Sequence, residues 1–118
     1  MSAHSQIGLL TKLLDVASLR HEVIAQNVAN VNTPNYRRQD VQFHEVFAQA
    51  LASGSPGAAL NVQPAVVATP GGYERFDGNN VDIDVEMGQL AKNSLAYKVY
   101  AQILAMQLAQ MRSAISGH

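Results

Sequence analysis

The sequence predicts a mainly α-helical fold in which two long helices, one at each end of the chain, pair as an antiparallel coiled-coil-like hairpin. Three observations lead to this prediction. Apolar residues alternate at spacings of three and four along residues 7–31, and they do so again along residues 83–115. Between these stretches, residues 53–80 hold five of the eight glycines and three of the four prolines, which is typical of an irregular loop or a short β-hairpin.

The N-terminal helix is predicted over residues 5–30, with Ser5 as its N-cap, because a serine hydroxyl can accept a hydrogen bond from a first-turn amide. Its apolar seam includes one polar residue, His21, for which we expect packing or an interhelical hydrogen bond. The seam consists of Ile7, Leu10, Leu14, Ala17, His21, Ile24, Val28 and Val31. More apolar side chains lie beside the seam, and we expect them to contact neighbouring molecules: Leu9, Leu13, Val16 and Val23.

The first helix is expected to end before Pro34, because a residue that precedes proline is driven out of the α-helical region. In the turn that follows, Asn35 is one of the few residue types that tolerate a positive φ. Alternation of Val41 and Phe43 then predicts extended chain, and the rest of residues 37–52 predicts a short helical turn. The chain thus divides into residues 1–36, residues 37–80 and residues 81–118, with both terminal helices forming one core domain.

The C-terminal helix is predicted to begin near Asp82, since acidic residues favour the positive end of a helix dipole and no acidic residue follows Glu86. Its seam consists of Ile83, Met87, Leu90, Ser94, Tyr97, Ala101, Leu104, Leu108, Met111 and Ile115. Apolar residues also lie off this seam, at Leu95, Val99, Ile103 and Met106, and the remaining positions are largely uncharged amides. A solvated helix normally carries Lys and Glu there, so we expect this helix to be buried on several sides by other chains.

Composition excludes several classes of function. The net charge of −1 and the pI near 6.4 provide no basic surface for nucleic acid. The absence of cysteine excludes disulfides, thiolate metal sites and cysteine nucleophiles. No apolar run approaches the roughly 20 residues that span a bilayer. The first residues lack the charged and apolar regions of a cleaved signal peptide, so we expect no cleaved signal peptide.

No catalytic, cofactor-binding or metal-binding residue is predicted, and we expect the chain not to be an enzyme. No two of the four histidines have the i, i+4 spacing of a metal-binding helix. His4 and His118 lie at the ends, and His44 is expected on the surface. The carboxylates of residues 77–86 lack the spacing of a calcium-binding EF-hand loop and suit turn formation and helix capping.

Two further groups of side chains are interpreted as structural. Tyr36, Tyr97 and Tyr100 are expected to pack in the core or at an interface, because tyrosine buries an apolar ring and keeps one hydroxyl for a partner. For Arg37 and Arg38 two hypotheses remain open: contact with acidic groups of an adjacent subunit, or a solvated pair of loop charges.

The end of the first helix carries a motif that resembles the N-terminal signature of bacterial flagellar rod, hook and hook-associated axial proteins, N-x-A-N-x-x-T-x-G-Y. The matching segment includes Asn27, Ala29, Asn30, Asn32, Thr33, Pro34, Asn35 and Tyr36. Asn35 replaces the usual glycine of the family. Residues 77–84, followed by Glu86-Met87, Leu90-Ala91, Asn93-Ser94 and Tyr97, resemble the start of the C-terminal helix of the family's proximal rod subunits. The resemblance covers both ends of the chain and leaves residues 53–75 unmatched.

The resemblance implies a structural subunit of the proximal rod of the flagellar basal body, a torque-transmitting drive shaft that crosses the periplasm. It further implies other copies of the chain, other rod proteins and the MS-ring/rod adaptor as partners, and export through the flagellar type III apparatus. Assembly is expected along the two helix seams. The alternatives are another short proximal rod subunit or, from a different class, a helical export chaperone or adaptor.

Overall fold

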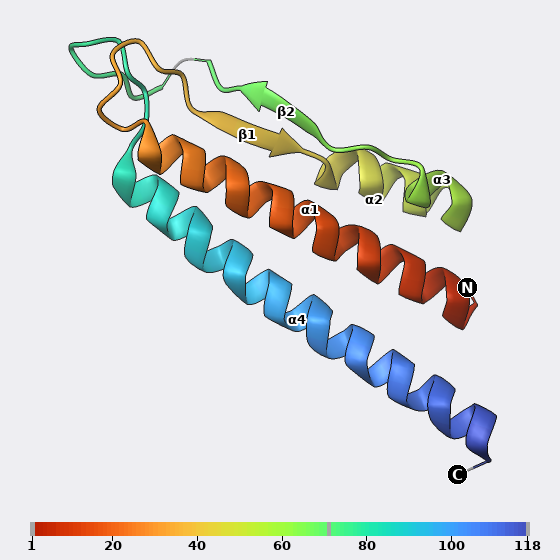
Figure 1. Ribbon diagram of the computed structural model, residues 1–118. Coiled ribbons are helices and arrows are strands. Elements are labelled where there is room, and N and C mark those ends of the chain that lie inside the picture. The colour runs from red at the N-terminus through yellow and green to blue at the C-terminus, as the bar shows by residue number, and fades with distance from the viewer. Residues whose placement is uncertain (1, 71, 118) are drawn as a thin grey trace.

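The computed structural model describes residues 2–70 and 72–117 and is mainly helical, as predicted. Its elements, in chain order, are α1 (Ala3–Ala29), β1 (Gln39–Gln42), α2 (His44–Ala52), α3 (Pro56–Leu60), β2 (Ala65–Ala68) and α4 (Ile83–Ser116). Figure 1 shows α1 in the middle of a flat molecule, with the strands and short helices along one side and α4 along the other. The two long helices run antiparallel, and both chain ends lie at the same end of the molecule.

Helix α1 begins earlier than predicted. Its N-cap is Ser2, whose hydroxyl accepts a hydrogen bond from the backbone N–H of Ser5 at 3.1 Å. The prediction of Ser5 as the cap was wrong, because nothing in the preceding residues breaks the helix and a second serine stands three positions upstream. At the other end, Asn30 is the C-cap, and the chain turns before Pro34 as expected.

The middle of the chain forms a small two-stranded antiparallel sheet and two short helices. Strand β1 pairs with β2 in a register that sets Gln39 opposite Ala68. The extended chain around Val41 and the helical turn after Phe43 are confirmed as β1 and α2. Helix α3 was not predicted, although Ser55 caps it and Pro56 occupies its first turn, which is a recognisable start signal.

The apolar core lies between one face of α1 and this middle segment. It contains Leu9, Val16 and Val23 of α1, with Val41, Phe43, Phe47 and Ala59. The expectation that Leu9, Leu13, Val16 and Val23 contact neighbouring molecules was therefore wrong: these side chains are covered by their own chain. Each such burial contributes about 1.5–3 kcal/mol for a Leu, Val or Phe side chain. Within residues 53–80, Ala59, Leu60 and Val62 thus cover part of the core.

Helix α4 begins at the N-cap Asp82, whose carboxylate accepts from the N–H of Asp84, and ends at Gly117 in the left-handed conformation. It packs on α1 along a narrow line, where Asn93 is buried and donates to the backbone carbonyl of Ala17 at 2.8 Å. Figure 1 shows the two helices together where α4 begins and separating toward the chain ends. Within the described residues, no helix is both long and hydrophobic enough to cross a bilayer.

The molecule is one helix thick. Its Cα atoms extend 64 × 28 × 14 Å, with a radius of gyration of 17.8 Å, against about 13 Å for a compact domain of 100 residues. A helix with its side chains is about 10–12 Å across, so no second layer covers either broad face. This geometry leaves much of α4 exposed.

Candidate functional site

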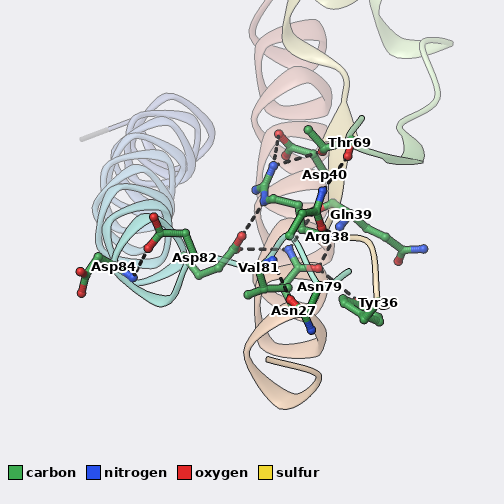
Figure 2. A network of polar contacts seen from close by, with 12 residues as sticks. Asn27, Tyr36, Arg38, Gln39, Asp40, Thr69, Asn79, Val81, Asp82 and Asp84 are labelled. Carbon is green, nitrogen blue, oxygen red and sulfur yellow. Dashed lines mark hydrogen bonds and ion pairs between the residues drawn. The ribbon is translucent and has the colours of Figure 1, made fainter. Parts of the chain in front are cut away.

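The motif at the end of α1 forms part of a buried polar junction that ties α1 to β1 and α4. Asn27 lies at its centre and is fully buried. Its side-chain oxygen accepts from the N–H of Gln39 at 2.9 Å and from the Tyr36 hydroxyl at 3.2 Å. Its amide nitrogen donates to the carbonyl of Gln39 at 2.8 Å and to Glu86 at 3.2 Å. Figure 2 shows Asn27, Tyr36 and Arg38 gathered beside α1.

An ion pair connects this junction to the first turn of α4. The Arg38 guanidinium donates through Nε to Glu86 Oε1 at 2.6 Å and through Nη1 to the Thr69 hydroxyl at 3.1 Å. Glu86 has no exposed surface, so its charge is stabilised by Arg38 and Asn27 rather than by water. Of the two hypotheses for the Arg37-Arg38 pair, neither describes Arg38, which binds a carboxylate of its own chain. Arg37 forms an exposed pair with Glu74 at 3.3 Å.

Two consecutive asparagines before α4 complete the junction. The Asn79 side chain donates to the backbone carbonyls of Asn30 and Thr33, both at 2.8 Å. Its oxygen accepts from the N–H of Val81 at 2.8 Å. The Asn80 side chain accepts from the N–H of Arg38 at 2.5 Å and donates to a carbonyl of residue 69 at 2.9 Å. These bonds join the end of α1 to the start of α4 through segments nearly 50 residues apart.

The turn after α1 has the backbone that the motif predicted. Asn35 adopts φ 62°, the only positive φ at a non-glycine residue within the described part of the chain. Its N–H donates to the carbonyl of Asp77 at 3.0 Å. Gly78, at φ 83°, approaches Asn35 so closely that an added Cβ would lie 2.4 Å from the Asn35 side-chain oxygen. Asn35 and Gly78, which both have a positive φ, therefore lie in close contact.

Two ionisable groups in the junction respond to this environment. Burial, and then the charge of Glu86, raise the pKa of Tyr36. The N–H of Asn79, which donates to Asp77, and the neighbouring Arg75 hold the pKa of the Asp77 carboxyl below its usual range, against an opposing effect of burial. Within the described residues, every buried side-chain nitrogen and oxygen has a hydrogen-bond partner.

Of the remaining motif residues, Asn30 and Thr33 take part in the junction through their backbone carbonyls, which accept from Asn79. Asn30 and Thr33 bond to each other through their side chains at 3.1 Å, while Ala29, Asn32 and Pro34 are exposed. The residues that sequence reasoning missed as site residues are Arg38, Asn79, Asn80, Glu86 and Asn93. Hydropathy patterns do not detect buried polar residues, and the only sequence signal for most of them was the resemblance around residues 77–97.

The predicted helix seams are only partly buried in one copy. Among the seam residues, Ile24 is buried. Six have intermediate exposure: Leu10, Leu14, Val28, Leu90, Leu104 and Met111. Five are exposed: His21, Met87, Tyr97, Leu108 and Ile115. The hydrogen bond between the helices comes from Asn93, whereas His21 lies exposed beside two cavities of about 510 and 390 Å³ between α1 and α4. The exposed seam residues Met87 and Tyr97 line these cavities, so they face α1 across open space rather than packing against it.

The histidines do not form a chemical site. His44 lies at the surface, as expected, and partial desolvation of its ring, followed by the charges of Arg20 and Lys92, lowers its pKa. His118 lies outside the described residues. Among residues 2–70 and 72–117, no three His, Asp or Glu side chains group as metal ligands.

Helix α4 exposes a second apolar stripe off its seam, of which Ile103 also lines a cavity together with Leu9 and Leu13 of α1. The stripe consists of Leu95, Val99, Ile103 and Met106, of which Leu95 is 64% and Met106 is 60% exposed. Contiguous exposed apolar surface of this kind marks an interaction site in soluble proteins. Fold and site together define a two-helix structural subunit, closed at one end by a polar junction and apolar on faces that one copy leaves uncovered.

Comparison with known proteins identifies the family. The model of the family described as flagella basal body rod protein matches residues 14–37, which include the whole motif. The flagellar basal body rod protein FlgB of Borrelia hermsii is 33% identical over 117 residues, covering 84% of this chain and 87% of its own length. The FlgB proteins of Salmonella typhimurium and Aquifex aeolicus are each 30% identical, covering 88% and 94% of this chain. The chain belongs to the FlgB family of flagellar basal body rod proteins.

Proposed function

We propose that this chain is a structural subunit of the proximal rod of the flagellar basal body, where it assembles helically through its terminal helices into a torque-transmitting shaft. The observation that carries the proposal is the apolar surface of α4, which one copy leaves exposed on a molecule 14 Å thick. Family membership supports the same role. In this role the chain turns over no substrate and needs no cofactor.

The partners we propose are other copies of the chain, other rod proteins and, at the base, the adaptor between the MS ring and the rod. The partly covered seams of α1 and α4 would meet helices of these neighbours, since alternating spacings of three and four suit helix-to-helix packing. We further propose export through the flagellar type III apparatus and a final position in the part of the rod that crosses the periplasm.

Deleting the gene in its native bacterium tests this function. The expected result is loss of flagella, with restoration by the wild-type gene and recovery of the protein in purified basal bodies. Normal flagella after deletion, or basal bodies free of the protein, would contradict the proposal. Restoration of flagella by the chain in a strain lacking a different short rod subunit would instead favour the alternative within the family.

A helical export chaperone or adaptor remains the alternative from a different class. Such a protein would stay a soluble dimer and would be absent from the finished basal body. Sizing of the purified chain over a range of concentrations separates the two, because a polymer-forming subunit grows beyond a dimer as concentration rises.

A further inference from the structure

The backbone groups on the two edges of the small sheet can be assigned from its register. The N–H of Thr69 donates to the carbonyl of Arg38 at 2.9 Å, directly beyond the paired strands. Bonded and non-bonded pairs alternate along an antiparallel ladder, so Val67, two residues before Thr69, also bonds to β1. The backbone N–H and C=O groups of Val66 and Ala68 therefore point away from β1.

The outer edge of β1 is closed by α1. The Asn27 side chain accepts from the N–H of Gln39 at 2.9 Å and donates to the carbonyl of the same residue at 2.8 Å. These are the two bonds that another strand would make with Gln39. The next outward N–H, that of Val41, donates to the Asp40 carboxylate at 2.8 Å. A further strand therefore cannot pair with β1.

The outer edge of β2 is open. Figure 1 shows β2 on the side of β1 away from α1, along the rim of the flat molecule. Among the described residues, no backbone group outside the two strands bonds to Val66 or Ala68, and Val66 is 45% exposed. Unpaired N–H and C=O groups along a strand edge are a template for pairing with a strand of another chain.

Charge does not protect this edge. Natural sheets commonly protect exposed edges with charged side chains, especially lysine, but residues 61–73 contain no Lys, Arg, Asp or Glu. The strand itself consists of two valines between two alanines, and valine favours strand pairing. The segment contains a different protective residue, proline, on each side of β2.

Pro64 and Pro70 occupy positions at which proline shortens the open edge without weakening the sheet. Pro64 is two residues before Val66, and Pro70 is two residues after Ala68, so both continue the outward-facing series of alternate residues. Proline has no backbone N–H and cannot donate to a ladder. At position 67 a proline would remove a bond to β1, whereas at positions 64 and 70 it removes only donors that a strand of another molecule would use.

We propose that Pro64 and Pro70 keep the open edge of β2 from pairing with a strand of another molecule. They leave two outward donors, those of Val66 and Ala68, and a ladder of that length is too short to hold a further strand. Copies that come together at high local concentration thereby avoid joining through their sheets. The inference goes beyond the proposed function, because it assigns to the middle segment a role that does not depend on rod assembly.

Hydrogen exchange of the Val66 and Ala68 amides in the double variant Pro64→Thr/Pro70→Thr tests the proposal. Threonine restores both donors and suits a strand, so we expect strand-paired dimers in which exchange of the two amides slows by about tenfold or more as the protein concentration rises. In the wild-type chain the exchange rate of these amides should not depend on concentration. The matched control is Pro56→Thr, in the first turn of α3, which should behave like wild type. Concentration-dependent protection in the wild-type chain, or unchanged exchange in the double variant, would overturn the proposal.

A proline placed within β2 tests the assigned direction of the backbone groups, even if the double variant folds poorly. Val66→Pro in the wild-type chain removes only an outward donor, so its thermal unfolding midpoint should stay close to that of wild type. Val67→Pro removes a bond to β1 and should unfold at a clearly lower temperature. Added to the double variant, Val66→Pro should abolish the concentration-dependent protection of the Ala68 amide. Equal destabilisation by Val66→Pro and Val67→Pro would show that Val66 does not face outward and would overturn the proposal.

Discussion

At the scale of single residues, the molecule depends on polar side chains in places where hydropathy predicts apolar ones. Asn27, Asn79 and Glu86 are buried, yet each is hydrogen-bonded to other groups of the chain. A buried hydrogen-bonded network adds modest net stability, but loss of one partner leaves a desolvated group behind. The motif residues therefore hold the ends of α1 and α4 in one specific arrangement.

The buried ion pair makes the sharpest prediction at this scale. Glu86→Gln should lower the free energy of unfolding by about 3 kcal/mol, because Arg38 would keep its charge in a largely buried place without a carboxylate. Urea unfolding measures the change. The matched control is Glu74→Gln, which breaks the exposed pair with Arg37 and should cost at most about 1 kcal/mol. Equal losses in the two variants would show that Glu86 carries no special role.

Asp77 makes the stability depend on pH. Its pKa is lowered in the folded chain, mainly by the N–H of Asn79, so its contribution is present at neutral pH and is lost as the pH falls below about 4. We expect Asp77→Asn to melt at a lower temperature than wild type at pH 7, with the gap shrinking in acid. A gap that stays constant across this range would contradict the assigned cause.

Gly78 is required by both conformation and space. Gly78→Ala should destabilise the chain by about 1 kcal/mol or more, because its φ of 83° is unfavourable for residues with a Cβ and the new atom would press on Asn35. Thermal unfolding measures the loss. Gly54→Ala is the informative comparison, since Gly54 has a similar φ of 80° with open space around it, and it should lose less. The difference between the two isolates the contact with Asn35.

At the scale of elements, α1 is shared between two partners while α4 has only one. One face of α1 is covered by β1, α2 and α3, and another meets α4 along a narrow line. Helix α4 receives no cover from the middle segment over most of its length and exposes apolar residues on several sides. The stability of α4 in one copy therefore depends more on its own helical propensity than that of α1 does.

Helix α4 contains a glycine whose replacement should reveal this dependence. Gly88→Ala should raise the free energy of unfolding by about 0.5–1 kcal/mol, because glycine is a poor helix former and an added Cβ meets no atom within 4 Å. Circular dichroism during thermal unfolding measures the gain. A more stable variant that no longer enters basal bodies would indicate that a neighbouring chain approaches the helix at Gly88. A less stable variant would contradict the packing described here.

At the scale of the whole molecule, flatness is the property that bears on function. A slab one helix thick cannot bury both sides of its long helices, and the cavities between α1 and α4 open where the helices separate. Neighbouring molecules would supply the missing layers. Many modest interfaces of this kind suit a shaft that has to resist torsion over its whole length.

Leu104 tests whether the seam is needed for assembly. It is of intermediate exposure in one copy, and Leu104→Asp would place an unpaired carboxylate between helices, which costs several kcal/mol once neighbours exclude water. We expect loss of rod assembly and of swimming, while the core around Val16 and Phe47 keeps the middle segment folded. Leu104→Met, which conserves volume, should swim normally. Normal swimming by Leu104→Asp would contradict assembly through this seam.

The sequence by itself determined the local features of this protein. Spacings of three and four residues predicted both long helices, an acidic cluster marked the start of α4 at Asp82, and asparagine at position 35 predicted the positive φ. Each of these features depends on interactions within a few residues along the chain. The Ser5 cap was wrong by three residues because two serines offered the same local signal.

Only the tertiary structure decided which face of each helix meets which partner. Val16 and Val23 face their own middle segment rather than a neighbour, and Arg38 binds Glu86, a residue 48 positions away. Periodicity shows that a helix has apolar faces but carries no information about what covers them, because covering is a contact between distant segments. Buried polar pairs produce no periodic pattern in the sequence. The polar junction that orients the two helices was therefore found only in the tertiary structure, where the end of α1, β1 and the start of α4 meet.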